Sequence, residues 1–159
     1  MTVIQTLNKV VELAVKRRDD ALGNLAQAKR ELQQATDQMV QLTGYGQEAQ
    51  ARWSERCSVG VDAALLHHHR IFMQKIDHAL AFQKEVLRNR EELVERTQSQ
   101  VHAAERDVAG LQKFTDRKLM AIRQLAQRQD QKNTDEMALS IHLRQSLAQA
   151  QARTQELRS

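Results

Sequence analysis

The chain has 159 residues, is 28% charged and only 3% aromatic, and contains no proline. This composition argues against a compact, roughly spherical core, and the abundance of Ala, Gln, Leu, Arg and Glu is typical of long helices or coiled coils. Basic and acidic residues are interspersed, so the net charge of +4 indicates solvated helix faces and not a nucleic-acid-binding surface. Cys57 is the single cysteine, which excludes an intrachain disulfide and favours a reducing, cytoplasmic setting.

The first predicted element is a helix over about residues 3–56. Steps of alternately three and four residues lead from Ile4 to Trp53, and every position on this path is apolar except Arg18 and Gly46. A 3-4 repeat sustained over this length is the signature of a coiled-coil seam. Alanine occupies most of the alternate seam positions, and its small side chain lets a partner helix approach closely. The larger seam residues of this helix include Leu7, Val11, Leu25, Leu32 and Met39.

Residues 57–62 are predicted to form a turn. Gly60 permits the chain to bend there, and Asp62 is placed to cap the helix that follows. A second apolar series, at seven-residue steps, predicts a helix over about residues 63–130. Its seam residues are Leu80, Leu87, Val94, Val101 and Val108.

Folding at this turn pairs Leu32 with Leu87 and leaves everything from Asp116 onward without an intrachain partner. We therefore expect an all-α fold: one antiparallel two-helix coiled-coil domain over residues 1–159, with an overhanging, helical or partly disordered tail at about 131–159. An apolar stripe without an internal partner either frays or docks onto another protein. The overhanging stripe contains Leu119, Ile122, Leu125, Leu139 and Leu143.

The end of the second helix has two readings. Asn133 and Glu136 have the spacing of a capping box, which favours a break near Asp130 to Asn133 and a restart beyond it. A continuous helix that frays toward its end is the alternative.

No motif predicts catalysis. His67, His68 and His69 are adjacent, and because successive helical residues point about 100° apart they cannot converge on one ion. The sequence has no nucleophile constellation and no Gly-rich phosphate loop. We expect a protein that is not an enzyme and holds no metal or cofactor. No apolar block approaches the roughly 20 residues of a membrane span, so direct insertion is not expected.

Aromatic residues gather near the predicted turn. Tyr45, Trp53, Phe72 and Phe82 lie close to it, and only Phe114 lies far away. Short stripes beside them on the two helices either form one exposed adhesive patch or broaden the seam near the turn. Partly exposed aromatics are typical of protein-binding hot spots.

In their order and spacing these features resemble the FliJ family of flagellar type III export proteins. The resemblance runs through Leu7, Leu13 and Ala14, Gln41-Leu42 with Tyr45 and Glu48, the Ser58 to Val61 turn, Phe72, Ile76 and Ala79, and the closing segment Asp130 to Ala138. It covers most of the chain. Order and spacing carry it, because coiled coils share composition easily.

The resemblance implies a part in flagellum biogenesis, and so in motility and chemotaxis, as a component of the protein export apparatus. It implies a coiled-coil stalk similar to that of rotary ATPases, inserted in the hexameric export ATPase ring and linked to the transmembrane export gate. Export chaperones are further expected partners. The protein is then monomeric alone and cytoplasmic, and associates peripherally with the inner membrane through the apparatus.

The same resemblance suggests where the partners bind. By position, the gate-contacting patch of the family maps onto Gln38, Leu42, Tyr45, Phe72, Ile76 and Ala79. Ala49 and Gln83 depart from the tyrosine and histidine expected beside it. We expect the ATPase-ring contact on the overhanging stripe, at Leu119, Ile122, Leu125, Leu139 and Leu143.

Two alternatives remain open from the sequence. The equivalent stalk of a virulence-type injectisome differs only through the closing segment that begins with Asp130-Gln-Lys. A generic coiled-coil scaffold would instead homodimerise through its tail.

Overall fold

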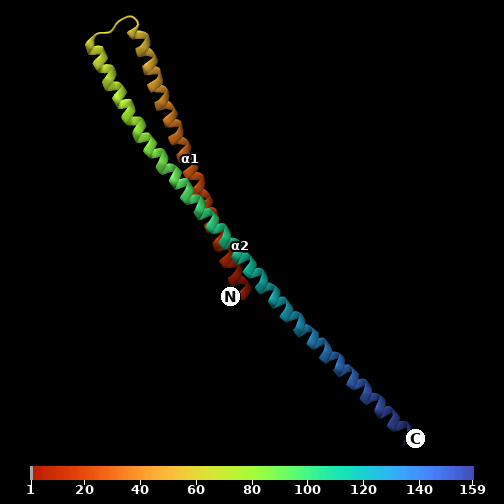
Figure 1. Ribbon diagram of the computed structural model, residues 1–159. Coiled ribbons are helices and arrows are strands. Elements are labelled where there is room, and N and C mark those ends of the chain that lie inside the picture. Colours follow the sequence, from red (N-terminus) through yellow and green to blue (C-terminus); the bar gives the residue numbers. More distant parts are fainter. Residues whose placement is uncertain (1) are drawn as a thin grey trace. The chain divides into compact units, whose positions relative to one another are not determined.

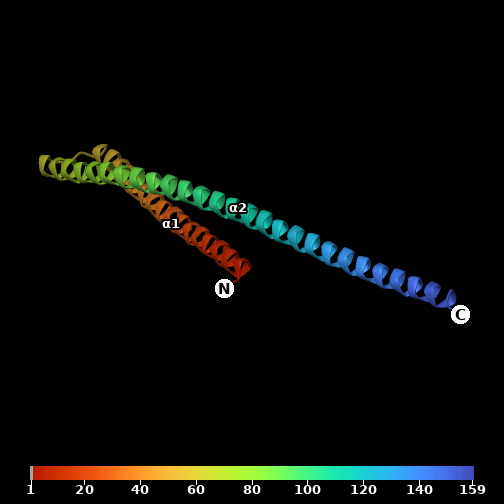
Figure 2. The same cartoon turned by 90° about the horizontal axis from the view of Figure 1, so that it is seen from below.

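The computed structural model describes residues 2–159, which fold into two helices. Helix α1 is Val3–Cys57 and helix α2 is Ala63–Glu156. From the connecting turn the two helices run back alongside each other in opposite directions, as both views show (Figure 1, Figure 2). The predicted all-α fold, with two long helices packed as a hairpin, is confirmed.

The described residues form two compact units. The hairpin unit is Val10–Ala109 and contains the turn. The terminal unit consists of Gly110–Ser159 together with the described residues up to Lys9. The single coiled-coil domain that the heptad pattern favours over residues 1–159 stays a prediction.

Side chains cap the N-termini of both helices. In α1 the Gln5 backbone N–H donates to Thr2 Oγ1 at 3.3 Å, and the Thr2 N–H donates to Gln5 Oε1 at 3.2 Å, which makes a reciprocal capping box. At the start of α2 the Leu65 N–H donates to Asp62 Oδ1 at 2.8 Å. Gly60 has a φ of 102°, a left-handed conformation that glycine adopts without strain. The cap at Asp62 and the bend at Gly60 lie where the sequence predicted them.

Small residues make the closest part of the α1 seam. Ala14, Ala28 and Ala35 are 7%, 2% and 3% exposed, and they are the three buried residues of this helix. On α2, Val101 and Val108 are buried. The other predicted seam residues are half-buried: Leu7, Val11, Leu25, Leu32, Met39, Leu80, Leu87 and Val94. The alanines thus form the narrowest contact, with larger side chains along its edge.

A second row of α2 carries polar side chains into the seam, which the heptad reading missed. Gln83 and Thr97 are 7% and 8% exposed. Gln83 Nε2 donates to the Ala35 carbonyl at 2.9 Å, and Thr97 Oγ1 donates to the Leu93 carbonyl at 2.8 Å. No buried side-chain N or O atom in residues 2–159 lacks a hydrogen-bond partner. The polar row is therefore tolerated because each buried group is satisfied.

Between the two buried polar residues, Arg90 forms an ion pair across the helices. Its Nη1 atom lies 3.0 Å from Glu31 Oε2, with side chains 43% and 30% exposed. The predicted register pairs Leu32 with Leu87. This ion pair and the hydrogen bond from Gln83 to the Ala35 carbonyl both join residues that lie within one helical turn of the partners which that register gives them.

Of the two readings of the end of α2, the continuous helix holds: α2 continues to Glu156, and the predicted boundary near Asp130 is wrong. Asn133 does not cap a new helix. Its Oδ1 accepts a hydrogen bond from Gln129 Nε2 at 3.2 Å, one turn earlier, and Thr134 Oγ1 donates to the Asp130 carbonyl at 2.9 Å. Residues 127–136 have no apolar side chain, which imitates a linker, yet they include neither Pro nor Gly to stop a helix.

Candidate functional site

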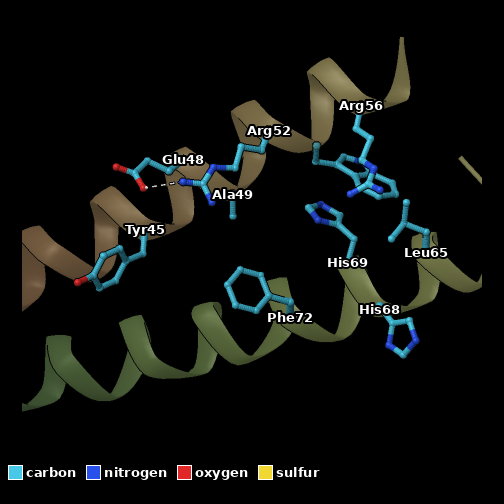
Figure 3. Close-up of a pocket in the computed structure, with 10 residues that line it drawn as sticks. Tyr45, Glu48, Ala49, Arg52, Arg56, Leu65, His68, His69 and Phe72 are labelled. Atoms are coloured by element: carbon cyan, nitrogen blue, oxygen red, sulfur yellow. Dashed lines mark ion pairs between the residues drawn. The ribbon is translucent and has the colours of Figure 1, made fainter. Parts of the chain in front are cut away.

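A groove lies between the end of α1 and the start of α2, inside the hairpin unit. Its volume is about 430 Å³. On α1, Tyr45, Ala49 and Trp53 recur every four residues, so helical periodicity places them on one face. Leu65 and Phe72 line it from α2. Figure 3 shows Tyr45 and Phe72 pointing into the space between the two helices. The tip of the hairpin thus has an apolar surface that is concave.

Two stacked rings join the helices in this groove. The Trp53 and His69 ring centroids lie 4.1 Å apart with an interplanar angle of 5°. Both residues are half-buried. The flat stack pairs a residue of α1 with one of α2 and so helps to hold the two helix ends together. The sequence placed Trp53 at the last position of the seam and among the aromatic residues near the turn, and His69 only in a histidine run, so their stacking was not predicted.

Charged side chains rim the same groove. Arg52 and Arg56 come from α1, with Glu48 one turn before Arg52. Arg52 Nη2 lies 3.8 Å from Glu48 Oε2, and the two side chains are 82% and 66% exposed (Figure 3). Such an exposed pair contributes little to stability. The arginines were missed because their neighbours in sequence give no signal that a concave surface lies beside them.

The six residues predicted to contact a gate are divided between the groove and the seam. Tyr45 and Phe72 line the groove and are 56% and 47% exposed. Leu42, Ile76 and Ala79 are half-buried along the seam.

Gln38 is exposed on α1, and its Oε1 accepts a hydrogen bond from Gln83 Nε2 at 3.3 Å. Gln83 itself is buried, whereas Ala49 lines the groove. A methyl group built on Gly46 would lie 3.2 Å from Ile76 Cγ2, so the helices approach closely at that level. Both readings of the stripes thus hold in part: the aromatic residues form an open patch, and the aliphatic ones broaden the seam.

The stripe predicted to contact an ATPase ring lies in the terminal unit. Leu119 is half-buried, and every residue from Met120 to Ser159 is exposed. The exposed fractions of Ile122, Leu125, Leu139 and Leu143 are 38%, 64%, 59% and 54%. Leu147 is exposed as well, and so are three large apolar residues that the predicted stripe did not include: Met120, Met137 and Ile141. This part of α2 is an unpartnered apolar surface.

These surfaces are suited to holding protein segments. Within residues 2–159, no three His, Cys, Asp or Glu side chains are grouped so that they could hold a metal ion. Neither described helix has an apolar stretch long enough to cross a membrane. The groove offers aromatic and cationic contacts, and the terminal unit offers aliphatic ones.

Comparison with known proteins identifies the family. The family model described as Flagellar FliJ protein matches residues 4–147, which is nearly the whole chain. A search of curated proteins finds no match. The matched range includes the groove and the whole of the stripe from Leu119 to Leu143. The chain therefore belongs to the FliJ family, a non-enzymatic component of the flagellar export apparatus.

Proposed function

We propose that this protein is the coiled-coil stalk that links the export ATPase ring to the transmembrane export gate. The observation that carries the proposal is the exposed apolar surface of α2 beyond Leu119, which has no partner within the described chain. Exposed Leu and Ile on this scale mark an interaction site. A second exposed apolar surface, the groove, lies in the hairpin unit, so one chain has two candidate binding surfaces.

In this proposal the terminal unit contacts the ATPase ring through Leu119, Ile122, Leu125, Leu139 and Leu143. Truncation after Gln124 removes most of the exposed stripe, and we expect it to abolish stimulation of the export ATPase. Truncation after Ala152 is the matched control, because it removes only the last residues, and it should leave stimulation intact. Full stimulation by the shorter protein would contradict this assignment.

The patch of Gln38, Leu42, Tyr45, Phe72, Ile76 and Ala79 contacts the gate. The double variant Tyr45→Ala with Phe72→Ala should weaken binding to the cytoplasmic part of the gate at least about tenfold, because half-exposed aromatics are typical hot spots. Phe82→Ala is the control: Phe82 is 72% exposed on α2 and does not line the groove. Unchanged gate affinity in the double variant, with helicity intact by circular dichroism, would refute the assignment.

Export chaperones are further proposed partners, and the protein associates with the inner membrane peripherally, through the apparatus. The alternative of an injectisome stalk is separated by which export ATPase and gate the chain binds in a pull-down.

The alternative of a homodimeric scaffold predicts twice the monomer mass in solution. We expect light scattering to give the monomer mass of 18.2 kDa. A tight dimer would instead support the scaffold.

A further inference from the structure

The groove at the hairpin tip is built to receive an apolar side chain. The stacked Trp53 and His69 rings form one wall, with centroids 4.1 Å apart. Tyr45 and Phe72 keep 56% and 47% of their surface exposed beside it. Aromatic surfaces of this kind are rigid and large, so an inserted side chain buries apolar area at a low cost in conformational entropy.

The charge around this apolar surface is unbalanced. Arg52 and Arg56 line the groove, and Glu48 is the only acidic residue among the described residues that line it. Glu48 holds Arg52 weakly, at 3.8 Å and with both side chains exposed. Arg56 makes none of the ion pairs found in residues 2–159. The groove therefore offers one guanidinium group, that of Arg56, which no carboxylate of the described residues pairs, and a second, that of Arg52, which is held only by a long, exposed ion pair.

We propose that this groove binds a short acidic segment of a partner protein. The segment inserts an apolar or aromatic side chain against Trp53 and Phe72 and places carboxylates on Arg52 and Arg56. Arginine is suited to this because its planar guanidinium binds a carboxylate through two hydrogen bonds. The inference rests on the proposed role of the tip as a partner-binding end, and it adds the chemistry of the partner and the residues that select it.

The observations favour this occupant over two others. A second copy would offer its own exposed stripe from Leu119 to Leu143, but the charges there are balanced, with Arg123, Arg128 and Lys132 against Asp130, Asp135 and Glu136, so it brings no excess of carboxylates to Arg52 and Arg56. A single-stranded nucleic acid would use both the rings and the arginines, yet it needs a basic track along the backbone. Along the hairpin, charges of both signs are mixed instead, as the ion pairs of Arg88 with Glu85 and of Arg90 with Glu31 show.

The test starts from a library of random 12-residue peptides displayed on phage and selected on the immobilised full chain. Enriched peptides should be rich in Asp and Glu around one aromatic or aliphatic anchor. The same library selected on Arg52→Glu with Arg56→Glu should enrich Lys and Arg instead. Peptides with no acidic bias on the natural chain, or the same peptides on both proteins, would overturn the proposal.

Fluorescence anisotropy of the most enriched peptide then measures affinity. We expect the double arginine variant and Trp53→Ala each to weaken binding at least about tenfold. The double variant Arg17→Glu with Arg106→Glu has the same change in net charge on exposed residues away from the turn, and it should bind like the natural chain. Because Arg52 and Arg56 are exposed, their replacement spares the fold even if Trp53→Ala unfolds the tip.

Two further outcomes separate the alternatives. A labelled 12-nucleotide single strand that binds more tightly than the peptide, and loses affinity in the same variants, would overturn the peptide assignment. Loss of gate binding in the Tyr45 and Phe72 variants concerns the proposed function and leaves the acidic preference to be judged separately. Conversely, a chain that binds the gate through Tyr45 and Phe72 but selects no acidic peptides would refute only the present inference.

Discussion

Replacing Ala28 by leucine tests how closely the two helices approach in the hairpin unit. Ala28 is 2% exposed, and Ala35, two turns further along the same face, is 3% exposed. Leucine adds an isopropyl group beyond the alanine methyl group, at a place where the facing helix leaves almost no open surface. The helices must then separate locally, or the new side chain must adopt an unfavourable rotamer.

The expected magnitude follows from this burial. Inserting extra carbons into a closely packed seam typically costs about 1–3 kcal/mol. The helix propensities of alanine and leucine differ by only a few tenths of a kcal/mol, so the change is a packing effect. With a urea dependence of about 1–3 kcal/mol per molar for a small protein, the unfolding midpoint should fall by roughly 1 M.

The assay is urea unfolding followed by circular dichroism at the helix band, with Ala26→Leu as the matched control. Ala26 lies on the exposed face of the same helix turn, so its replacement should shift the midpoint little. Equal midpoints for the two variants would refute the close approach. A more stable Ala28→Leu protein would do the same, because it would mean that the seam had room for the larger side chain.

Two other predictions concern the polar row of the seam. A double-mutant cycle on Arg90→Gln and Glu31→Gln should give a coupling energy of about 0.5–1 kcal/mol that shrinks with added salt, because the pair is only partly shielded from water. A cycle on the more exposed Arg52 and Glu48 should give almost no coupling energy. Equal coupling energies in the two cycles would contradict the difference in burial. Gln83→Glu should lower the free energy of unfolding by about 2–4 kcal/mol at neutral pH, since a carboxylate would face the Ala35 carbonyl without a donor, and the deficit should shrink toward pH 4 as the carboxylate is protonated. Gln83→Leu is the control with little pH dependence, and a pH-independent loss in Gln83→Glu would show that the side chain had swung out to solvent.

The helices, the seam positions and the turn can be predicted from short stretches of the sequence. The 3-4 repeat from Ile4 to Trp53 arises because each helix returns to the same face every 3.6 residues, and it needs no knowledge of the partner. Gly60 and Asp62 act on the backbone of their own neighbours, so the bend and the cap are also readable. The family follows from the same order and spacing.

The tertiary structure decided what lies between the helices. Whether the row of Gln83 and Thr97 faces the partner depends on the rotation of one helix about its axis relative to the other, which the apolar pattern does not report. The groove depends on the same rotation, because Trp53 meets His69 only when both faces turn toward each other.

The end of α2 is a further case. The polar segment 127–136 has the composition of a helix boundary. Its side chains instead form hydrogen bonds one turn apart within the helix, such as that from Gln129 to Asn133, and α2 continues to Glu156. Periodicity describes one helix at a time, and two periodic segments joined by a turn were enough to predict the hairpin. The contacts that fill the hairpin and shape its binding groove depend on how two helices meet, which only the folded structure decides.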